Sequence, residues 1–225
     1  MPHPTETFRA RYRASIAPRY NPWLHALFVF GYGAACIALA WSTTQHITAL
    51  QWLTVPATLV FFNLCIYLVH RHLGHHKHAL ARLFYARHTG DHHSFFTPGH
   101  MTYDSPRDWR VILFPAWLIV LHSVAITLPA WWLLKHLSPN VAGLFAGCMI
   151  LGYLLYELFH ACEHLPVDHP VARLPWLRQM HRLHALHHRR ELMQGRNFNI
   201  VLPLMDYLFG TLHWEPRAQD NQESS

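Results

Sequence analysis

Charged residues are almost missing from four long stretches of this sequence. No Lys, Arg, Asp or Glu occurs between Tyr20 and His70. Residues 23–41, 50–69, 111–134 and 141–159 carry a single charge among them, Glu157, near the end of the last stretch. Each stretch is close to the roughly 20 apolar residues that cross the hydrocarbon core of a bilayer. The alternative is a soluble helical bundle, but soluble helices alternate polar and apolar faces. We therefore predict four membrane spans.

Sequence patterns for a bound redox cofactor are also missing. No glycine-rich dinucleotide loop occurs, and no haem-binding, flavin-binding or iron–sulfur pattern. The four cysteines, Cys36, Cys65, Cys148 and Cys162, show no paired spacing, and we interpret them as packing residues. Cys162 lies two residues from His160 and should point away from it on a helix. Any electrons that the chain uses must therefore come from another protein.

Basic residues lie on one side of the predicted spans. Of the 18 Lys and Arg residues, only Lys135 falls in a loop on the other side. An excess of basic residues marks cytoplasmic loops, so we expect both termini and the histidine clusters described next to be cytoplasmic. The net charge of +6 then faces the anionic inner leaflet, and the sequence gives no reason to predict nucleic-acid binding.

Histidine is abundant instead, with 22 copies, and ten of them form two pairs and two triplets. The clusters are His70 and His75; His88, His92 and His93; His160 and His164; and His184, His187 and His188. The first two clusters follow the second span, and the last two follow the fourth. Imidazole suits iron, zinc and copper. A structural zinc ion takes four ligands, whereas ten histidines could give two ions about five each and leave a position for oxygen or water. We interpret the clusters as one binuclear metal site at the membrane surface.

Three other interpretations of the histidines remain open. They could form a surface that buffers metal or contacts lipid headgroups, a metal-binding membrane scaffold, or part of a divalent-metal transporter. Transporters place their ligands near mid-membrane, whereas these clusters lie at span ends. Only His122 and Asn63 lie at mid-depth. His122 is either functional or a neutral histidine hydrogen-bonded between helices, and His72, His76, His78, His100 and His181 lie near the clusters but outside their patterns.

Local patterns place the clusters on helices. A helix from about Ala79 should put His88 and His92 on one face, where residues i and i+4 can bind one ion. The fourth span should continue through Glu157, His160 and His164, and another helix should cover 181–190. The nearby carboxylates are Glu157, Asp91, Glu163 and Asp168, and we expect some of them to hold the second ring nitrogen of a metal-binding histidine.

The four histidine patterns and the four-span plan resemble the fatty acid hydroxylase/sterol desaturase superfamily of integral-membrane di-iron enzymes. The segment 197–211, from Asn197 and Asn199 through Asp206 to Phe209-Gly210-Thr211, resembles the closing motif of that family. The resemblance covers roughly residues 20–214. One departure is the second cluster, which has three residues before its His-His pair where many members have two.

The resemblance implies an all-α four-helix transmembrane bundle with a cytoplasmic, histidine-rich helical cap that holds two irons, or zinc in their place. It implies oxygen-dependent hydroxylation of a fatty-acyl lipid, although desaturation, sterol methyl oxidation, aldehyde chemistry and carotenoid hydroxylation stay open. By motif match the ligands would be His70, His75, His88, His92, His93, His160, His164, His184, His187 and His188, supported by Glu157, Asp91, Asn197, Asn199 and Asp206.

The predicted domain layout is a basic arm over 1–20, the membrane domain over 21–214 and a disordered tail over 215–225. Reduction of oxygen by a lipid hydroxylase needs two electrons from outside, so we expect a ferredoxin or cytochrome b5-like donor. Such donors are acidic, and opposite charge would steer them to the arginines around the fourth cluster, which are Arg173, Arg178, Arg182, Arg189, Arg190 and Arg196.

Overall fold

The computed structural model describes residues 4–215, and these form helices joined by loops. Apart from one bridge between Thr97 and His100, the described part of the chain holds no β-structure. Four helical segments are long and apolar enough to cross a membrane: Pro22–Ser42, Ala49–Gly74, Ala116–Leu134 and Pro139–Glu163. The predicted all-α, four-span membrane bundle is therefore confirmed. The side of the membrane that each end faces stays a prediction.

Capping side chains mark the start of three of the four spans, the third being the exception. The first span is α2 (Pro22–Ser42), and the second joins α3 (Ala49–Trp52), α4 (Thr54–Val69) and a π-helical turn, His70–Gly74. The third joins α8 (Ala116–His122), a π-helical turn, Ser123–Thr127, and α9 (Leu128–Leu134), and the fourth is α10 (Pro139–Glu163). The Asn21 side chain accepts hydrogen bonds from the first turn of α2, and the Ser138 hydroxyl does the same for α10. A proline follows each of these two caps, where its missing N–H costs nothing.

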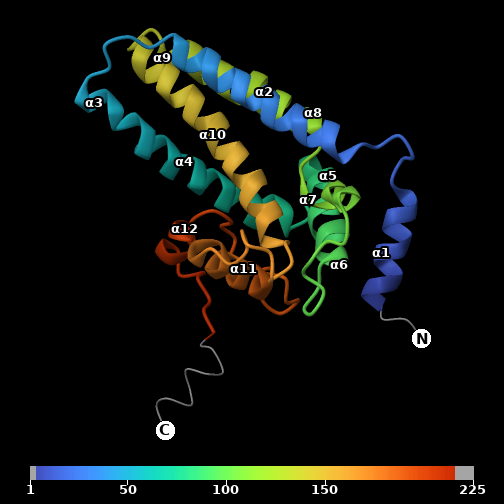
Figure 1. Cartoon of the computed structure of the whole chain (residues 1–225). Helices are drawn as coiled ribbons and strands as arrows, with labels where there is room; N and C mark the ends of the chain where they lie inside the picture. The colour runs from blue at the N-terminus through green and yellow to red at the C-terminus, as the bar shows by residue number, and fades with distance from the viewer. Residues whose placement is uncertain (1–3, 216–225) are drawn as a thin grey trace.

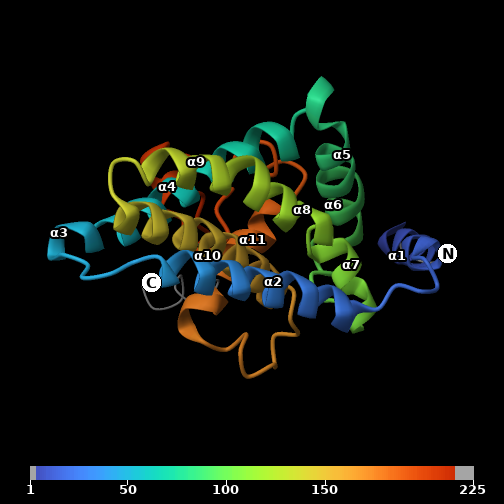
Figure 2. The same ribbon diagram turned by 90° about the horizontal axis from the view of Figure 1, so that it is seen from above.

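Helix α10 is the central helix of the bundle. It lies between α2 and α4 in Figure 1, and between α2 and the α8–α9 span when seen from above (Figure 2). In its most apolar 18-residue window, 67% is buried inside the protein, whereas the corresponding windows of the other three spans are 11% to 17% buried. Gly143 and Gly147, four residues apart, let α2 approach, because a Cβ on Gly147 would lie 2.1 Å from Trp41 Nε1. Small residues at this spacing are typical of contacts between membrane helices.

The third span begins later than the apolar stretch from residue 111 suggests. A separate short helix, α7 (Trp109–Ile112), comes first, and the chain then breaks before α8 at Ala116. Pro115 has no N–H to continue a helix. At the break, the Phe114 N–H donates to both carboxylate oxygens of Glu157 on α10, at 3.1 and 3.2 Å.

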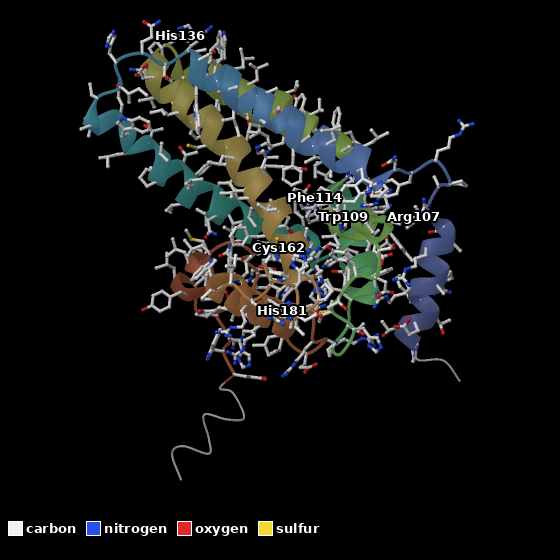
Figure 3. All side chains as sticks on the ribbon, in the orientation of Figure 1. Arg107, Trp109, Phe114, His136, Cys162 and His181 are labelled. Carbon is white, nitrogen blue, oxygen red and sulfur yellow. The ribbon has the colours of Figure 1, made fainter. Side chains whose placement is uncertain are left out.

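The short helices gather at one end of the bundle, which we call the cap (Figure 1). The cap contains α5 (Arg82–Tyr85), a π-helical turn, Ala86–His92, α6 (His93–Phe95), α7, α11 (Pro175–His187) and α12 (Leu204–Leu208). Figure 3 places His136 at the opposite end of the bundle from Cys162 and His181. Helix α11 begins six residues before the predicted start at His181, because Pro175 occupies its first turn.

The basic N-terminal arm contains a docked helix, α1 (Pro4–Ser15), which packs against α6. Arg13 donates to both carboxylate oxygens of the fully buried Asp108 at 2.9 and 2.8 Å, and to Asp104 at 2.6 Å. Arg9 is also buried and lies 4.7 Å from the centre of the Phe95 ring. Apart from Glu215, the predicted tail over 215–225 lies outside the described residues.

Candidate metal centre

The cap brings all ten histidines of the four clusters together, and all ten are buried. They form two groups. Group one consists of His70, His75, His88, His93 and His187, whose ligand atoms lie within 4.8 Å of one another. Group two consists of His92, His164, His184 and His188, together with His160, whose Nε2 lies 3.1 Å from that of His92. Their role as metal ligands stays a prediction.

The Nε2 atoms within each group point at one another. Nearest pairs in group one lie 2.8 to 3.2 Å apart, and those in group two lie 3.0 to 3.1 Å apart. Metal–nitrogen bonds of about 2.1 Å would separate neighbouring ligand atoms by about 3.0 Å around an octahedral ion and by about 3.4 Å around a tetrahedral one. The observed spacing therefore fits two metal ions, each surrounded by imidazole nitrogens.

The other ring nitrogen of five histidines donates to a backbone carbonyl. The donor–acceptor pairs are His70 to Phe198, His92 to Val111, His164 to Met101, His187 to Arg196 and His188 to Phe96. A carbonyl only accepts hydrogen bonds, so the proton of each ring is on Nδ1 and the lone pair is on Nε2. This fixes both the tautomer and the direction of each ring, as outer partners of metal-binding histidines do.

Burial also keeps these imidazoles neutral. Desolvation lowers the pKa of His75 and His88, and the neighbouring imidazoles lower it further. Desolvation is likewise the main reason that the pKa of His93, His184 and His187 lies well below its ordinary value. A neutral imidazole is the form that binds a metal.

Two π-helical turns explain how the groups are sorted. In a π-helical turn the N–H of residue i+5 bonds to the carbonyl of residue i, whereas residues five apart on an α-helix lie about 140° apart around the axis. His70 and His75 are related by one such turn, and the Nε2 of His88 lies 3.2 Å from that of His93 by another. The expected pairing of His88 with His92 on one ion is therefore wrong, because His92 belongs to group two.

Neighbouring histidines in each triplet divide between the groups. His93 and His187 belong to group one, and the adjacent His92 and His188 belong to group two. The rings of His93 and His188 stack at 4.1 Å where the groups meet. Each triplet thus links the two groups and holds them side by side.

The closing segment acts on the site through its backbone. Asp206 accepts hydrogen bonds from the N–H groups of Phe198 and Asn199 and from the Thr211 hydroxyl. The Asn197 side chain donates to the carbonyls of Leu183 and His213, and Asn197 itself has a positive φ of 56°. Burial raises the pKa of Asp206 even though these donors lower it. The three predicted supporting residues Asn197, Asn199 and Asp206 therefore shape the loop whose carbonyls orient His70 and His187.

The nearby carboxylates have unequal roles. Glu157 bonds to the Phe114 N–H rather than to a histidine, and Asp168 is exposed. Asp91 is half-buried beside Arg87, and burial raises its pKa. Only Glu163 approaches a ring of either group, with Oε2 3.6 Å from His184 Nδ1. The single sequence signal for this position was its place next to His164.

The remaining candidate residues lie outside both groups. His72, His76, His78, His100, His181 and Cys162 do not belong to the two candidate ligand groups found among residues 4–215. The ring of His122 packs inside the bundle, and its centroid lies 6.0 Å from that of the Phe62 ring and 5.5 Å from that of the Tyr153 ring. Asn63 donates to the Leu202 carbonyl, so its side chain contacts the closing segment.

An apolar cavity of about 440 Å³ ends at the histidines. Its polar lining includes Arg87, together with His88 of group one and His92 and His160 of group two. Its apolar wall includes Trp117 and Leu121 of α8, which are 53% and 49% exposed on the outside of the bundle. The cavity therefore connects the apolar surface of the bundle with both groups.

Comparison with known proteins agrees with this geometry. The sequence model of a family described as "Fatty acid hydroxylase" matches residues 55–211, a range that includes all ten histidines and the closing segment. Fatty acid 2-hydroxylases from Rattus norvegicus and Mus musculus are 31% and 30% identical to the chain over 159 residues, which is 68% of this chain. The chain spans 38% of the length of these curated relatives. No solved structure matches the chain.

Proposed function

Because the chain belongs to the fatty acid hydroxylase family, we propose that it is a membrane-bound di-iron oxygenase that hydroxylates the acyl chain of a lipid. The observation that carries this proposal is the cavity that joins the outer surface of α8 to both histidine groups. The proposed domain is the membrane domain over 21–214. We also propose that the cap faces the cytoplasm, because Lys135 alone among the 18 basic residues falls on the other side of the spans.

The cavity suits an extended apolar substrate. Leu73, Leu80, Leu83, Phe84 and Leu118 form much of its wall. Ligand sites of this kind combine a mostly apolar lining with a few polar groups that fix orientation. An acyl chain entering from the membrane past α8 would place one of its carbons beside His88, His92 and His160, where both groups are within reach.

The residues of the chain perform four tasks in this proposal. The ten Nε2 atoms hold the metal ions, and the carbonyls of the cap keep the rings in position. The cavity wall excludes water and orients the acyl chain. Bound iron would supply the dioxygen chemistry that no side chain can supply. Iron fits the all-imidazole donor set, which zinc and copper would also accept.

Electrons would enter the cap at a second hollow, whose lining shares no residue with that of the lipid cavity. This hollow, of about 570 Å³, is lined by His93 of group one, His188 of group two and the exposed Arg190. Arg173 and Arg178 are also exposed, whereas Arg189 is paired with Glu215 at 2.6 Å. An acidic ferredoxin or cytochrome b5-like donor docked at Arg190 would lie next to one histidine of each group.

Lipid mass spectrometry of cells with and without the protein tests the activity. Cells that express the chain should accumulate acyl lipids that are heavier by one oxygen atom, and cells that express His187→Ala should not. Unchanged lipids with the wild-type chain and a functioning donor would overturn the proposal.

Salt dependence tests the donor site. In a reconstituted assay, turnover with an acidic donor should fall as salt rises, and Arg190→Glu should lower it further. Turnover driven by a small chemical reductant should be the same for both proteins. If Arg190→Glu lowers both rates equally, docking at this hollow is wrong.

A further inference from the structure

We propose that Glu163 positions His184 and makes the two metal sites unequal, so that group two holds its ion more tightly than group one. This inference rests on the proposed function only in requiring that both groups bind a metal. Glu163 would be a positioning residue, since it acts on the ion through the His184 ring.

The first support is a set of buried atoms that lack partners. Glu163 is the last residue of α10 and has no exposed surface. Both of its carboxylate oxygens and His184 Nδ1 are buried without a hydrogen bond within the described residues. Buried polar atoms of this kind are costly and almost always find partners. Glu163 Oε2 lies 3.6 Å from His184 Nδ1.

A metal on His184 Nε2 would bring these atoms together. The distance of 3.6 Å is too long for a hydrogen bond, but a small shift of either side chain closes it. A metal ion draws electron density from the ring, which strengthens Nδ1–H as a donor toward an anionic acceptor. Carboxylate–histidine–metal chains of this form raise the basicity of the ligand and fix its orientation.

Within residues 4–215, group one lacks an equivalent carboxylate. His70 and His187 donate from Nδ1 to backbone carbonyls, and His75 Nδ1 lies 3.3 Å from the Thr89 hydroxyl. Among the described residues, no salt bridge joins a group-one histidine to an acid. In its ionised form, Glu163 would place a full negative charge beside group two, which would offset more of the charge of a divalent ion than these neutral acceptors do.

Glu157 provides a matched control for a substitution at Glu163. Both acids lie on α10 six residues apart, and both are fully buried. Glu157 accepts a backbone N–H from Phe114 rather than approaching a histidine. Gln at either position keeps the size and an acceptor oxygen but removes the carboxylate, and only the change at Glu163 removes it from beside a histidine ring.

The experiment follows loss of metal from the full-length protein. Wild type, Glu163→Gln and Glu157→Gln are purified in detergent, loaded anaerobically with ferrous iron and mixed with excess chelator. Wild type should release two ions in two phases of different rate. Glu163→Gln should accelerate only the slow phase, by about 10- to 100-fold, the usual effect of losing an outer carboxylate. Glu157→Gln should behave as wild type does.

Ligand variants assign the phases without relying on Glu163→Gln. His75→Ala removes a group-one ligand and should leave only the slow phase, whereas His188→Ala should leave only the fast one. The reverse assignment, a single phase in wild type, or equal effects of Glu163→Gln and Glu157→Gln would overturn the inference. A wild-type protein that binds no metal at all would refute the proposed function as well. This result therefore differs from those that overturn only the role of Glu163.

Discussion

Removal of the Arg13 side chain should release α1 from the cap. Arg13 makes three charged hydrogen bonds, two to Asp108 and one to Asp104. Asp108 is fully buried, and Arg13 is the only basic residue that forms a salt bridge with it among residues 4–215. Ala at this position would leave the Asp108 carboxylate with backbone donors alone.

The cost can be estimated from these contacts. Breaking one side of a buried ion pair costs about 3–5 kcal/mol, but the Arg13 side chain is 32% exposed, so water replaces part of what is lost. We expect the free energy of opening α1 to fall by about 2–3 kcal/mol. This corresponds to an increase of roughly 30- to 150-fold in the open population of α1. The rest of the bundle should stay folded, because local opening needs only the α1 contacts to break.

Hydrogen–deuterium exchange of residues 4–15 measures this opening directly. Arg13→Ala should exchange faster by the factor given above, and Arg11→Ala, an exposed position on the same helix, should not.

Acid should also speed the exchange of residues 4–15 in the wild-type protein. Burial raises the pKa of Asp108, but Arg13 and the Asp104 N–H lower it more, to below the ordinary 3.8. Because the folded state lowers the pKa of Asp108, the ionised carboxylate stabilises the docked helix at pH values above the ordinary pKa. This stabilisation is lost as the pH falls through the lower pKa of the folded state. Unchanged exchange in Arg13→Ala would refute the reasoning.

Three further predictions concern the site, the bundle and the cavity. His187→Ala or His92→Ala should abolish hydroxylation, measured by lipid mass spectrometry, and should leave membrane insertion intact, since insertion depends on the apolar spans. Gly147→Val should lower the melting temperature in detergent, because the new side chain would overlap Trp41; an unchanged temperature would contradict the packing. Leu118→Trp should reduce turnover of long acyl chains at constant metal content, and equal turnover would show that the cavity is not the route of the substrate.

Much of the fold could be predicted from the sequence because the signals are long. Four uncharged stretches predict four spans without any knowledge of their packing. The third span shows the limit of this approach. Residues 111–115 are apolar and continue the pattern, yet Pro115 and the bond between Phe114 and Glu157 end one helix and start another. Glu157 was one of four acids of which some were expected to hold a histidine ring, and in the structure its partner is a backbone N–H.

The histidine clusters could be predicted to meet, but their sorting could not. Residue spacing was interpreted with α-helical geometry, which pairs His88 with His92. The π-helical turns change that periodicity, and no local sequence pattern announced them. The outer partners were expected to be carboxylates, whereas backbone carbonyls orient five of the ten rings. Carbonyl positions depend on tertiary structure, and the sequence carries no direct record of them.

The central claim, that this chain uses a two-metal histidine site to insert oxygen into a lipid acyl chain, can be tested in one measurement. Purified, iron-loaded protein is incubated with an acyl lipid, a reduced donor and isotopically labelled dioxygen, and the lipid is examined by mass spectrometry. The proposed function predicts a hydroxylated lipid whose new oxygen carries the label. A product with oxygen from water, or no oxygenated product from protein that retains two irons, would contradict it.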